Sequence, residues 1–106
     1  MAKNNFTVTL SMRAEHMLIL HTEFLSRVSF AAADKLIEAF EKAKDLLEEN
    51  PLQYSFADDF DAVGIPEKTY RKRLFYDRYK MLYLIEGTNV YVDAIIDCRQ
   101  SNSELY

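Results

Sequence analysis

The stretch that decides the fold is residues 70–96, YRKRLFYDRYKMLYLIEGTNVYVDAII. It holds three runs rich in aromatic and aliphatic residues, which are typical of β-strands. The dipeptide Gly87-Thr88 predicts a tight hairpin between the last two runs, and Tyr76-Asp77-Arg78 predicts a short turn between the first two. The sequence therefore predicts strands over Tyr70–Tyr76, Tyr79–Glu86 and Asn89–Ile96.

Upstream of this stretch, the periodicity changes to that of helices. Residues 6–10 alternate apolar and polar side chains, which predicts one half-buried strand. Ser11 and Ser29 can each cap a helix, and proline ends the second helix at Asn50-Pro51. Residues 52–68 have no clear period and are predicted to be an irregular connection. The expected apolar stripes are Ala14, Met17, Leu18, His21, Phe24, Leu25 and Val28, then Leu36, Ile37, Phe40, Ala43, Leu46 and Leu47.

The predicted element order is β-α-α-β-β-β, which belongs to the α+β class. Two long amphipathic helices joined by a tight connection are expected to lie antiparallel and share one apolar seam. We therefore predict a single domain over residues 1–106, in which the helical hairpin packs on one face of a mainly antiparallel sheet. Leu36, Phe40 and Leu47 should then be buried.

The composition excludes several classes of protein. With 49% hydrophobic and 28% charged residues, it is typical of a soluble folded chain, and no apolar run approaches the ~20 residues that span a bilayer. Residues 1–5 lack the apolar core of a secretory signal, and the single cysteine, Cys98, cannot form an internal disulfide. These features predict a cytoplasmic protein. Because no glycine-rich phosphate loop, nucleophile elbow or paired-cysteine zinc motif is present, no cofactor or metal is expected.

The net charge of −4 hides an asymmetry along the chain. Residues 1–62 hold 6 Lys and Arg against 11 Asp and Glu, a balance of −5, whereas residues 63–106 hold 7 against 6, a balance of +1. Within residues 68–80, six cations face only Asp77, which gives +5. These cations, which we call the basic strip, are Lys68, Arg71, Lys72, Arg73, Arg78 and Lys80. Such a strip can hold a polyanion even on an acidic body, or it can be an ordinary solvated strand face.

Arginines two residues apart on a strand share a face, so Arg71 and Arg73 should point together. Lys80 can approach them from the next strand if the register allows it, and Arg99 follows the last strand at one edge of the sheet. Fixed cations of this kind can bind phosphates and stabilise the charge of a phosphorane-like transition state. Cross-strand ion pairs on the surface remain the alternative.

Other reactive residues have weaker patterns. His16 and His21 lie five residues apart, about 140° round a helix, and cannot chelate one metal together. His21 falls within the apolar stripe and is expected at the core or its boundary. Asp58, Asp59 and Asp61 form an acidic knot without further ligands at fixed offsets. Cys98 can be a packed side chain or, beside Arg99, an activated thiol.

The order and spacing of these features resemble the RelE/ParE toxins of bacterial type II toxin–antitoxin systems. The similarity comprises the first strand, two long helices that end in Glu49-Asn50-Pro51, and the stretch from Tyr70 to Gln100. Tyr79-Lys80-Met81-Leu82-Tyr83 matches the family's aromatic-basic-aliphatic-aliphatic-Tyr run, and Asp97-Cys98-Arg99-Gln100 matches its arginine-containing tail. The resemblance covers nearly the whole chain and rests on the order of degenerate motifs.

The resemblance implies a mechanism and a set of site residues. RelE-like members cleave messenger RNA on the ribosome without a metal: the 2′-hydroxyl attacks the adjacent phosphate and leaves a 2′,3′-cyclic phosphate. By position, Arg71 and Arg73 match the basic pair on the second strand and Lys80 matches the basic residue that opens the third. Arg99 matches the arginine after the last strand, and Tyr106 the tail tyrosine that stacks on a base. For an endoribonuclease, the four cations should converge on one concave face.

Two other functions remain open within the same resemblance. A ParE-like member inhibits DNA gyrase without enzymatic activity, and an inactive homologue retains only antitoxin binding. In each case the implied partner is a cognate antitoxin whose C-terminal segment wraps the domain. Its acidic residues are expected against residues 68–80 and its apolar side chains in a groove beside the helices. A homodimer also remains open.

Overall fold

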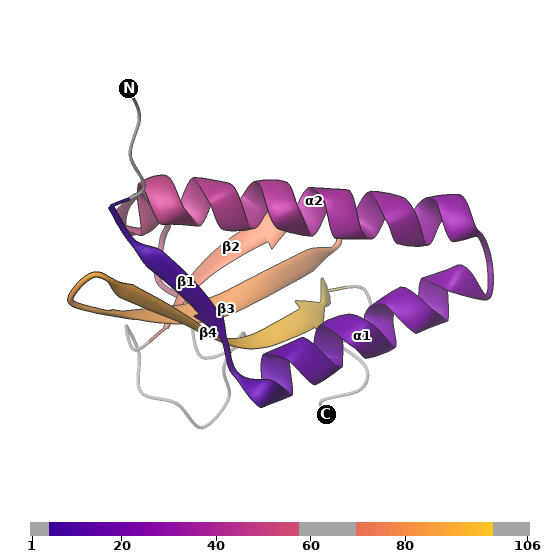
Figure 1. Cartoon of the computed structure of the whole chain (residues 1–106), viewed down its shortest axis with the longest axis horizontal. Coiled ribbons are helices and arrows are strands. Elements are labelled where there is room, and N and C mark those ends of the chain that lie inside the picture. The colour runs from indigo at the N-terminus through magenta and orange to yellow at the C-terminus, as the bar shows by residue number, and fades with distance from the viewer. Residues whose placement is uncertain (1–4, 58–69, 99–106) are drawn as a thin grey trace.

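The computed structural model describes residues 5–57 and 70–98. Its elements follow the predicted β-α-α-β-β-β order, with one additional short 3₁₀ turn (Figure 1). They are β1 (Thr7–Leu10), α1 (Met12–Ser26), α2 (Phe30–Glu49), η1 (Pro51–Gln53), β2 (Arg71–Phe75), β3 (Tyr79–Glu86) and β4 (Asn89–Asp97). No helix within these residues is long and apolar enough to cross a membrane.

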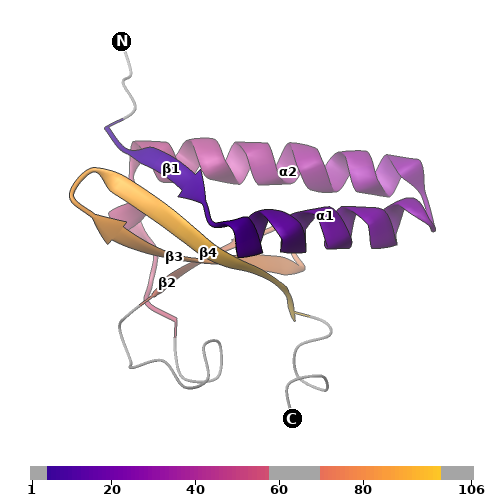
Figure 2. The same ribbon diagram turned by 60° about the horizontal axis from the view of Figure 1, so that its bottom comes forward.

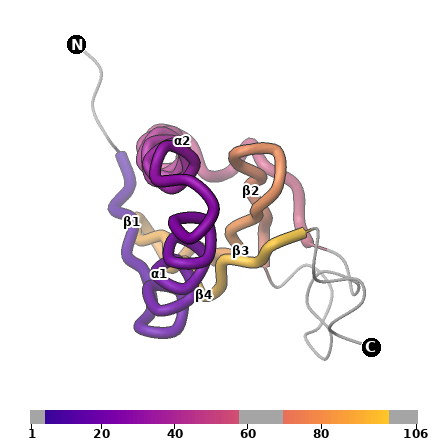
Figure 3. The backbone as a smooth tube through the Cα atoms, turned by 90° about the vertical axis from the view of Figure 1, so that its right-hand side faces the viewer, coloured from indigo at the N-terminus to yellow at the C-terminus, as the bar shows by residue number. Residues whose placement is uncertain are grey.

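The four strands form one sheet in the order β1-β4-β3-β2. β1 pairs with β4 in parallel, whereas the β4–β3 and β3–β2 pairs are antiparallel. Both helices lie on the same side of this sheet, as the views of Figure 2 and Figure 3 show. We call the opposite side of the sheet the far face. The predicted helical hairpin on a mainly antiparallel sheet is therefore confirmed.

The helix ends follow from local hydrogen bonding. The Ser11 hydroxyl accepts a hydrogen bond from the Ala14 N–H at 2.9 Å, and the Ser29 hydroxyl accepts one from the Ala32 N–H at 3.2 Å. Each serine thus satisfies a backbone donor that the first turn of a helix leaves without a partner. Pro51 opens η1 directly after α2, because proline cannot donate the next hydrogen bond of the helix.

The core lies between the helical hairpin and the sheet. Leu36, Phe40 and Leu47 are buried, as predicted. The expected stripe on α1 was partly wrong: Phe24 is 45% exposed, and Val28 follows the end of the helix and is 78% exposed. The fully buried side chains with the largest volumes are Tyr79, Tyr83, Leu36, Leu47, Met81, Ile95, Val90, Val92 and Pro51.

Two tight turns set the registers of the sheet. Gly87 has a φ of +61° in the hairpin between β3 and β4, a conformation that glycine adopts without steric cost. Between β2 and β3, Tyr76 and Asp77 have φ values of +55° and +51°, and the Arg78 N–H donates to the Phe75 carbonyl at 3.3 Å. Two central residues with positive φ are the mark of a type I′ turn. This turn pairs Phe75 with Tyr79 and thereby fixes the partners of every residue in β2.

The chain between α2 and β2 was predicted to be irregular, but its described part pairs with the sheet. Phe56 forms an antiparallel bridge with Arg71. The Ala57 N–H donates to the Tyr70 carbonyl at 2.7 Å, and the Lys72 N–H donates to the Ser55 carbonyl at 3.0 Å. This segment therefore covers the first part of the outer edge of β2.

Candidate functional site

Arg71 and Arg73 lie on one face of β2, and that face is covered by the helices. Arg71 pairs with Tyr83 and Arg73 pairs with Met81 in the antiparallel β2–β3 register. Directly paired residues point to the same side of a sheet, and both β3 partners are wholly buried in the core. The side chains of the two arginines therefore project from the edge strand toward the side of the sheet that holds α2.

Arg71 fastens the segment that follows α2. Its guanidinium donates to the Tyr54 carbonyl at 2.6 Å and to the Leu52 carbonyl at 3.4 Å. The same group lies over the Phe56 ring, 4.1 Å from its centroid, within the range of a cation–π contact. Carbonyl and ring partners thus occupy much of the guanidinium, so the contacts of Arg71 are those of a structural residue.

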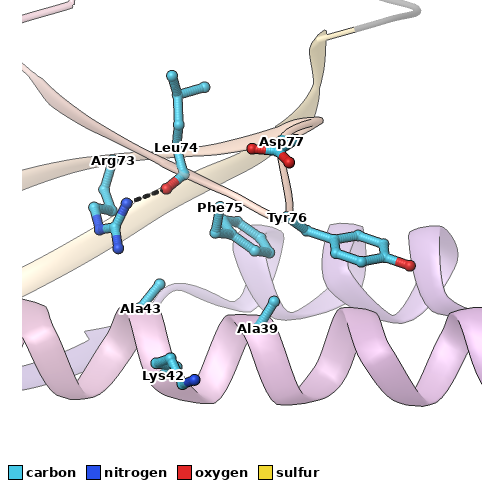
Figure 4. A pocket seen from close by; sticks show the side chains of 8 residues that line it. All are labelled: Ala39, Lys42, Ala43, Arg73, Leu74, Phe75, Tyr76 and Asp77. Carbon is cyan, nitrogen blue, oxygen red and sulfur yellow. Dashed lines mark hydrogen bonds between the residues drawn. The ribbon is translucent and has the colours of Figure 1, made fainter.

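The guanidinium of Arg73 has fewer contacts than that of Arg71. Its guanidinium lies 5.0 Å from the centroid of the Tyr54 ring and donates to the Leu74 carbonyl. Its Nε atom is buried and has no hydrogen-bond partner among residues 5–57 and 70–98. The side chain lines a hollow of about 300 Å³ between β2 and α2 (Figure 4). Of the two arginines, Arg73 is the one placed to meet a ligand.

Lys80 does not join the arginines, so the expected convergence of Arg71, Arg73 and Lys80 on one face is wrong. Lys80 pairs with Leu74 on β2 and with Ile96 on β4. Its alternation with the buried Tyr79 and Met81 places it on the far face of the sheet, and Lys72 shares that face by the same alternation. The Tyr76-Asp77 turn is the cause, because it sets the register between β2 and β3. A register shifted by one residue would have placed Lys80 on the same face as Arg73.

Lys72 and Lys80 lie near the thiol of Cys98 at the end of β4. Burial raises the pKa of the Cys98 thiol, and this effect outweighs the two lysine charges, which act to lower the pKa. A raised pKa disfavours the thiolate that nucleophilic chemistry requires. Of the two interpretations of Cys98, packing therefore fits better than an activated thiol.

Arg78 belongs to the basic strip in sequence but is neutralised in the fold. Its guanidinium makes a bidentate contact with the Asp97 carboxylate, with Nε 3.2 Å from both oxygens and an Nη 2.9 Å from one. The two side chains are only 14% and 3% exposed, and the hydrogen bond to Asp97 raises the pKa of Arg78. The Cys98 N–H also donates to the Arg78 carbonyl at 2.7 Å. Arg78 therefore ties β4 to the turn, and its charge is balanced by Asp97.

Several residues singled out in the sequence lie outside the described residues. Arg99 and Tyr106, two of the five expected catalytic residues, are among them. So are Lys68, at one end of the basic strip, and the acidic knot of Asp58, Asp59 and Asp61. The half-buried His21, in contrast, is placed as expected at the core boundary, where its Nε2 lies 2.8 Å from the Ile95 carbonyl oxygen.

An apolar groove lies on the outer surface of the helical hairpin; a groove beside the helices was expected from the sequence, but not the residues that line it. We call this hollow of about 280 Å³ the hairpin groove; its walls come from both helices, and Glu23 and Glu41 are its charged members. Ile37, which the helical periodicity placed in the seam, is 42% exposed here. The groove is lined by Leu18, Ile19, Thr22, Glu23, Ile37, Phe40 and Glu41. The apolar stripe of α2 is wider than one buried face, and this width is the sequence signal that could have located the groove.

Comparison with known proteins links this geometry to one fold. No family model and no curated protein matches the sequence. Among solved structures, a chain from the chromosomal ParDE TA system of P. aeruginosa matches with a TM-score of 0.67. The match covers 90% of this chain and 98% of that chain, at 10% sequence identity. At this identity the likeness shows the fold alone, and it confirms the RelE/ParE-like fold expected from the sequence.

Proposed function

We propose that this chain is the toxin half of a type II toxin–antitoxin pair and is neutralised by a cognate antitoxin. The observation that carries the proposal is the fold likeness to a chain of a ParDE TA system, which extends over nearly the full length of both chains. The exposed hairpin groove supports it, because an apolar hollow on a small domain is typical of a surface that binds another protein.

The placement of the basic residues favours a toxin that acts by binding. An endoribonuclease needs several cations around one phosphate. Here Arg71 is engaged in carbonyl and ring contacts, Arg78 is paired with Asp97, and Lys80 lies on the far face. Inhibition of DNA gyrase requires only a complementary surface and no converging cluster. The placement of the cations within residues 5–57 and 70–98 therefore favours gyrase inhibition over nuclease activity.

Metal-independent cleavage of ribosome-bound messenger RNA is the second candidate. The observation that favours it is Arg73, whose buried Nε has no partner within the described residues and whose side chain lines an open hollow. In this candidate Arg73 and Arg99 stabilise the phosphorane and Tyr106 stacks on a base. Lys80 contributes only if the substrate reaches the far face.

The hairpin groove is the proposed antitoxin site. Its apolar floor suits one face of an amphipathic helix, and the carboxylates of Glu23 and Glu41 suit basic residues at the edges of that helix. The bound segment would cover Ile19 and Ile37, which are exposed in the free domain. Burial of apolar anchors predicts an affinity that falls only modestly as salt rises.

Inducible expression in bacteria tests the toxin assignment. We expect growth arrest that is relieved by co-expression of the protein encoded beside this chain. Ile37→Asp should arrest growth as before but resist that relief, because the carboxylate enters an apolar groove. The matched control, Val28→Asp, alters an exposed residue outside the groove and should still be relieved. Absence of growth arrest by the folded wild-type chain would overturn the assignment.

A further inference from the structure

The end of the hairpin at which α1 and α2 are connected carries exposed apolar side chains, and we call this surface the hairpin tip. In the views of Figure 1 and Figure 2, this end projects beyond the ends of the strands, so no strand shields it. Four large apolar residues from the end of α1 to the start of α2 are exposed there: Leu20 (49%), Phe24 (45%), Val28 (78%) and Phe30 (80%). None of the four lines the hairpin groove.

The hairpin tip exposes more apolar surface than single hydrophobic residues usually do. At about 150–250 Å² per aromatic side chain and somewhat less per aliphatic one, the four exposed fractions amount to roughly 500 Å². The largest apolar patch of a typical monomer covers about 300–600 Å² and is often functional. Each partner contributes ~800 Å² to a standard protein–protein interface. The tip is therefore large enough to form the centre of a weak protein contact.

The apolar residues of α1 at the tip form a stripe that is complementary to itself. Leu20, Phe24 and Val28 are four residues apart, and residues at this spacing lie on one side of a helix. Val28 continues the stripe because Arg27, which caps α1, keeps helical backbone angles. If two copies of α1 pack antiparallel about a two-fold axis at Phe24, Leu20 of one copy faces Val28 of the other. The two Phe24 rings then meet at the axis, which is the symmetry of an isologous contact.

The charges beside this stripe are complementary to themselves as well. Glu23 and Arg27 are exposed and lie on the same flank of the stripe, about 100° and 60° round the helix from Phe24. In the antiparallel arrangement, Glu23 of one copy lies about 3 Å along the axis from Arg27 of the other, and the symmetry produces this pair twice. Residues 20–35 hold two carboxylates and two cations, a balance of 0 on a chain of net charge −4. Two tips can therefore meet without net repulsion.

We infer that the hairpin tip docks a second copy of this chain, and that the two copies form a weak symmetric dimer through antiparallel α1 helices. Phe24 is the central anchor, because an aromatic side chain packed at the middle of an interface usually carries much of its binding energy. The Glu23–Arg27 pairs at the rim fix the direction of pairing and add little to its strength. Only Glu23 also lines the hairpin groove, so the dimer surface and the proposed antitoxin site are largely separate.

Sedimentation equilibrium of the full chain, at concentrations up to about 1 mM, detects the weak dimers that small interfaces form. We expect a monomer–dimer equilibrium, with concentration-dependent amide shifts of the ¹⁵N-labelled chain centred on residues 20–30. Phe24→Glu should raise the Kd of the dimer about a hundredfold or more, because it removes the central ring and sets two carboxylates face to face. The control is Leu52→Glu, the same kind of change at a residue that is 56% exposed outside the tip, and it should dimerise as the wild type does.

Charge exchange tests the antiparallel arrangement. Glu23→Arg and Arg27→Glu should each weaken the dimer about tenfold, because either change sets like charges opposite each other twice. A mixture of the two variants should form heterodimers about as strong as the wild-type dimer, because an all-positive flank then meets an all-negative one. Recovery in the mixture also shows that both variants are folded. Glu49→Arg makes the same charge change at the other end of the hairpin and should leave the dimer unchanged.

Three outcomes would overturn the inference. They are a wild-type chain that stays monomeric at every concentration, amide shifts confined to residues outside 20–30, and a mixture of the two charge variants that remains monomeric. The first would leave the hairpin tip to a different protein, and the second would place the dimer interface elsewhere. A dimeric chain without toxicity would contradict the proposed function alone, whereas a toxic monomer would contradict this inference alone.

Discussion

At the scale of single residues, Tyr83 connects the end of α2 to the centre of the sheet. Its hydroxyl donates to the Pro51 carbonyl at 2.6 Å, and the side chain is wholly buried. Burial raises the pKa of Tyr83 above its ordinary value of 10.0. The folded state therefore holds this proton more tightly than the unfolded chain does, and the free energy of unfolding must fall as pH rises above about 10.

Replacement of Tyr83 by Phe tests this contact. We expect Tyr83→Phe to lower the free energy of unfolding by about 1–2 kcal/mol at pH 7, because the Pro51 carbonyl loses its donor. The variant should also lose less stability than the wild type between pH 9 and pH 11, in chemical denaturation followed by circular dichroism. Tyr91→Phe, at an exposed position, is the control. An unchanged alkaline loss in Tyr83→Phe would contradict the account.

The buried Arg78–Asp97 pair gives a second prediction at this scale. Arg78→Met would leave the Asp97 carboxylate, which is 3% exposed, without its bidentate partner. We expect a loss of about 3–5 kcal/mol in the free energy of unfolding, the usual cost of breaking a buried pair on one side. Addition of Asp97→Leu should restore part of that loss. Urea denaturation of the single and double variants measures both effects, and a loss below 1 kcal/mol in Arg78→Met would contradict the burial argument.

At the scale of elements, α2 packs its inner face on the sheet and leaves its outer face partly exposed to solvent. Phe40 is 5% exposed, and its ring lies 6.0 Å from that of Phe75 in an edge-to-face arrangement. We expect Phe40→Ala to cost about 3–5 kcal/mol of unfolding free energy. Ile37→Ala, on the half-exposed side of the same helix, should cost about 1 kcal/mol or less. Thermal unfolding of the two variants compares the faces, and equal losses would contradict the packing.

The helices and most strand bounds could be predicted from the sequence, because they follow from local periodicity and capping. The register between β2 and β3 could not. The usual sequence of a type I′ turn is Asn-Gly or Asp-Gly, whereas here Tyr76 and Asp77 have the two positive φ values. The turn sets whether Lys80 shares a face with Arg73, and although a turn at residues 76–78 was predicted, its type and the resulting register were not. The carbonyl groups that bind Arg71 could not be predicted either, because they belong to residues 52–68, which have no regular hydrophobic pattern.

At the scale of the whole molecule, the described cations of the basic strip are distributed to four places, one of which is that of Arg71 beside the segment that follows α2. Arg78 lies at the margin of the core, Lys72 and Lys80 lie on the far face, and Arg73 lines the hollow between β2 and α2. Within residues 5–57 and 70–98, the fold thus disperses these charges instead of gathering them around one point. The helical hairpin carries an exposed apolar groove to which a protein partner can bind.

The most direct test of this account is growth arrest by an Arg73→Ala, Arg99→Ala double variant, with a thermal unfolding curve to verify its fold. Primer extension on messenger RNA and gyrase supercoiling assays identify the target. The account predicts that the folded double variant still arrests growth, that messenger RNA stays whole, and that gyrase supercoiling falls with both wild type and variant. A nuclease would instead lose about a hundredfold to a thousandfold in rate with each arginine. The binding mechanism would be contradicted if the wild type cleaved messenger RNA and the folded double variant lost both this cleavage and growth arrest.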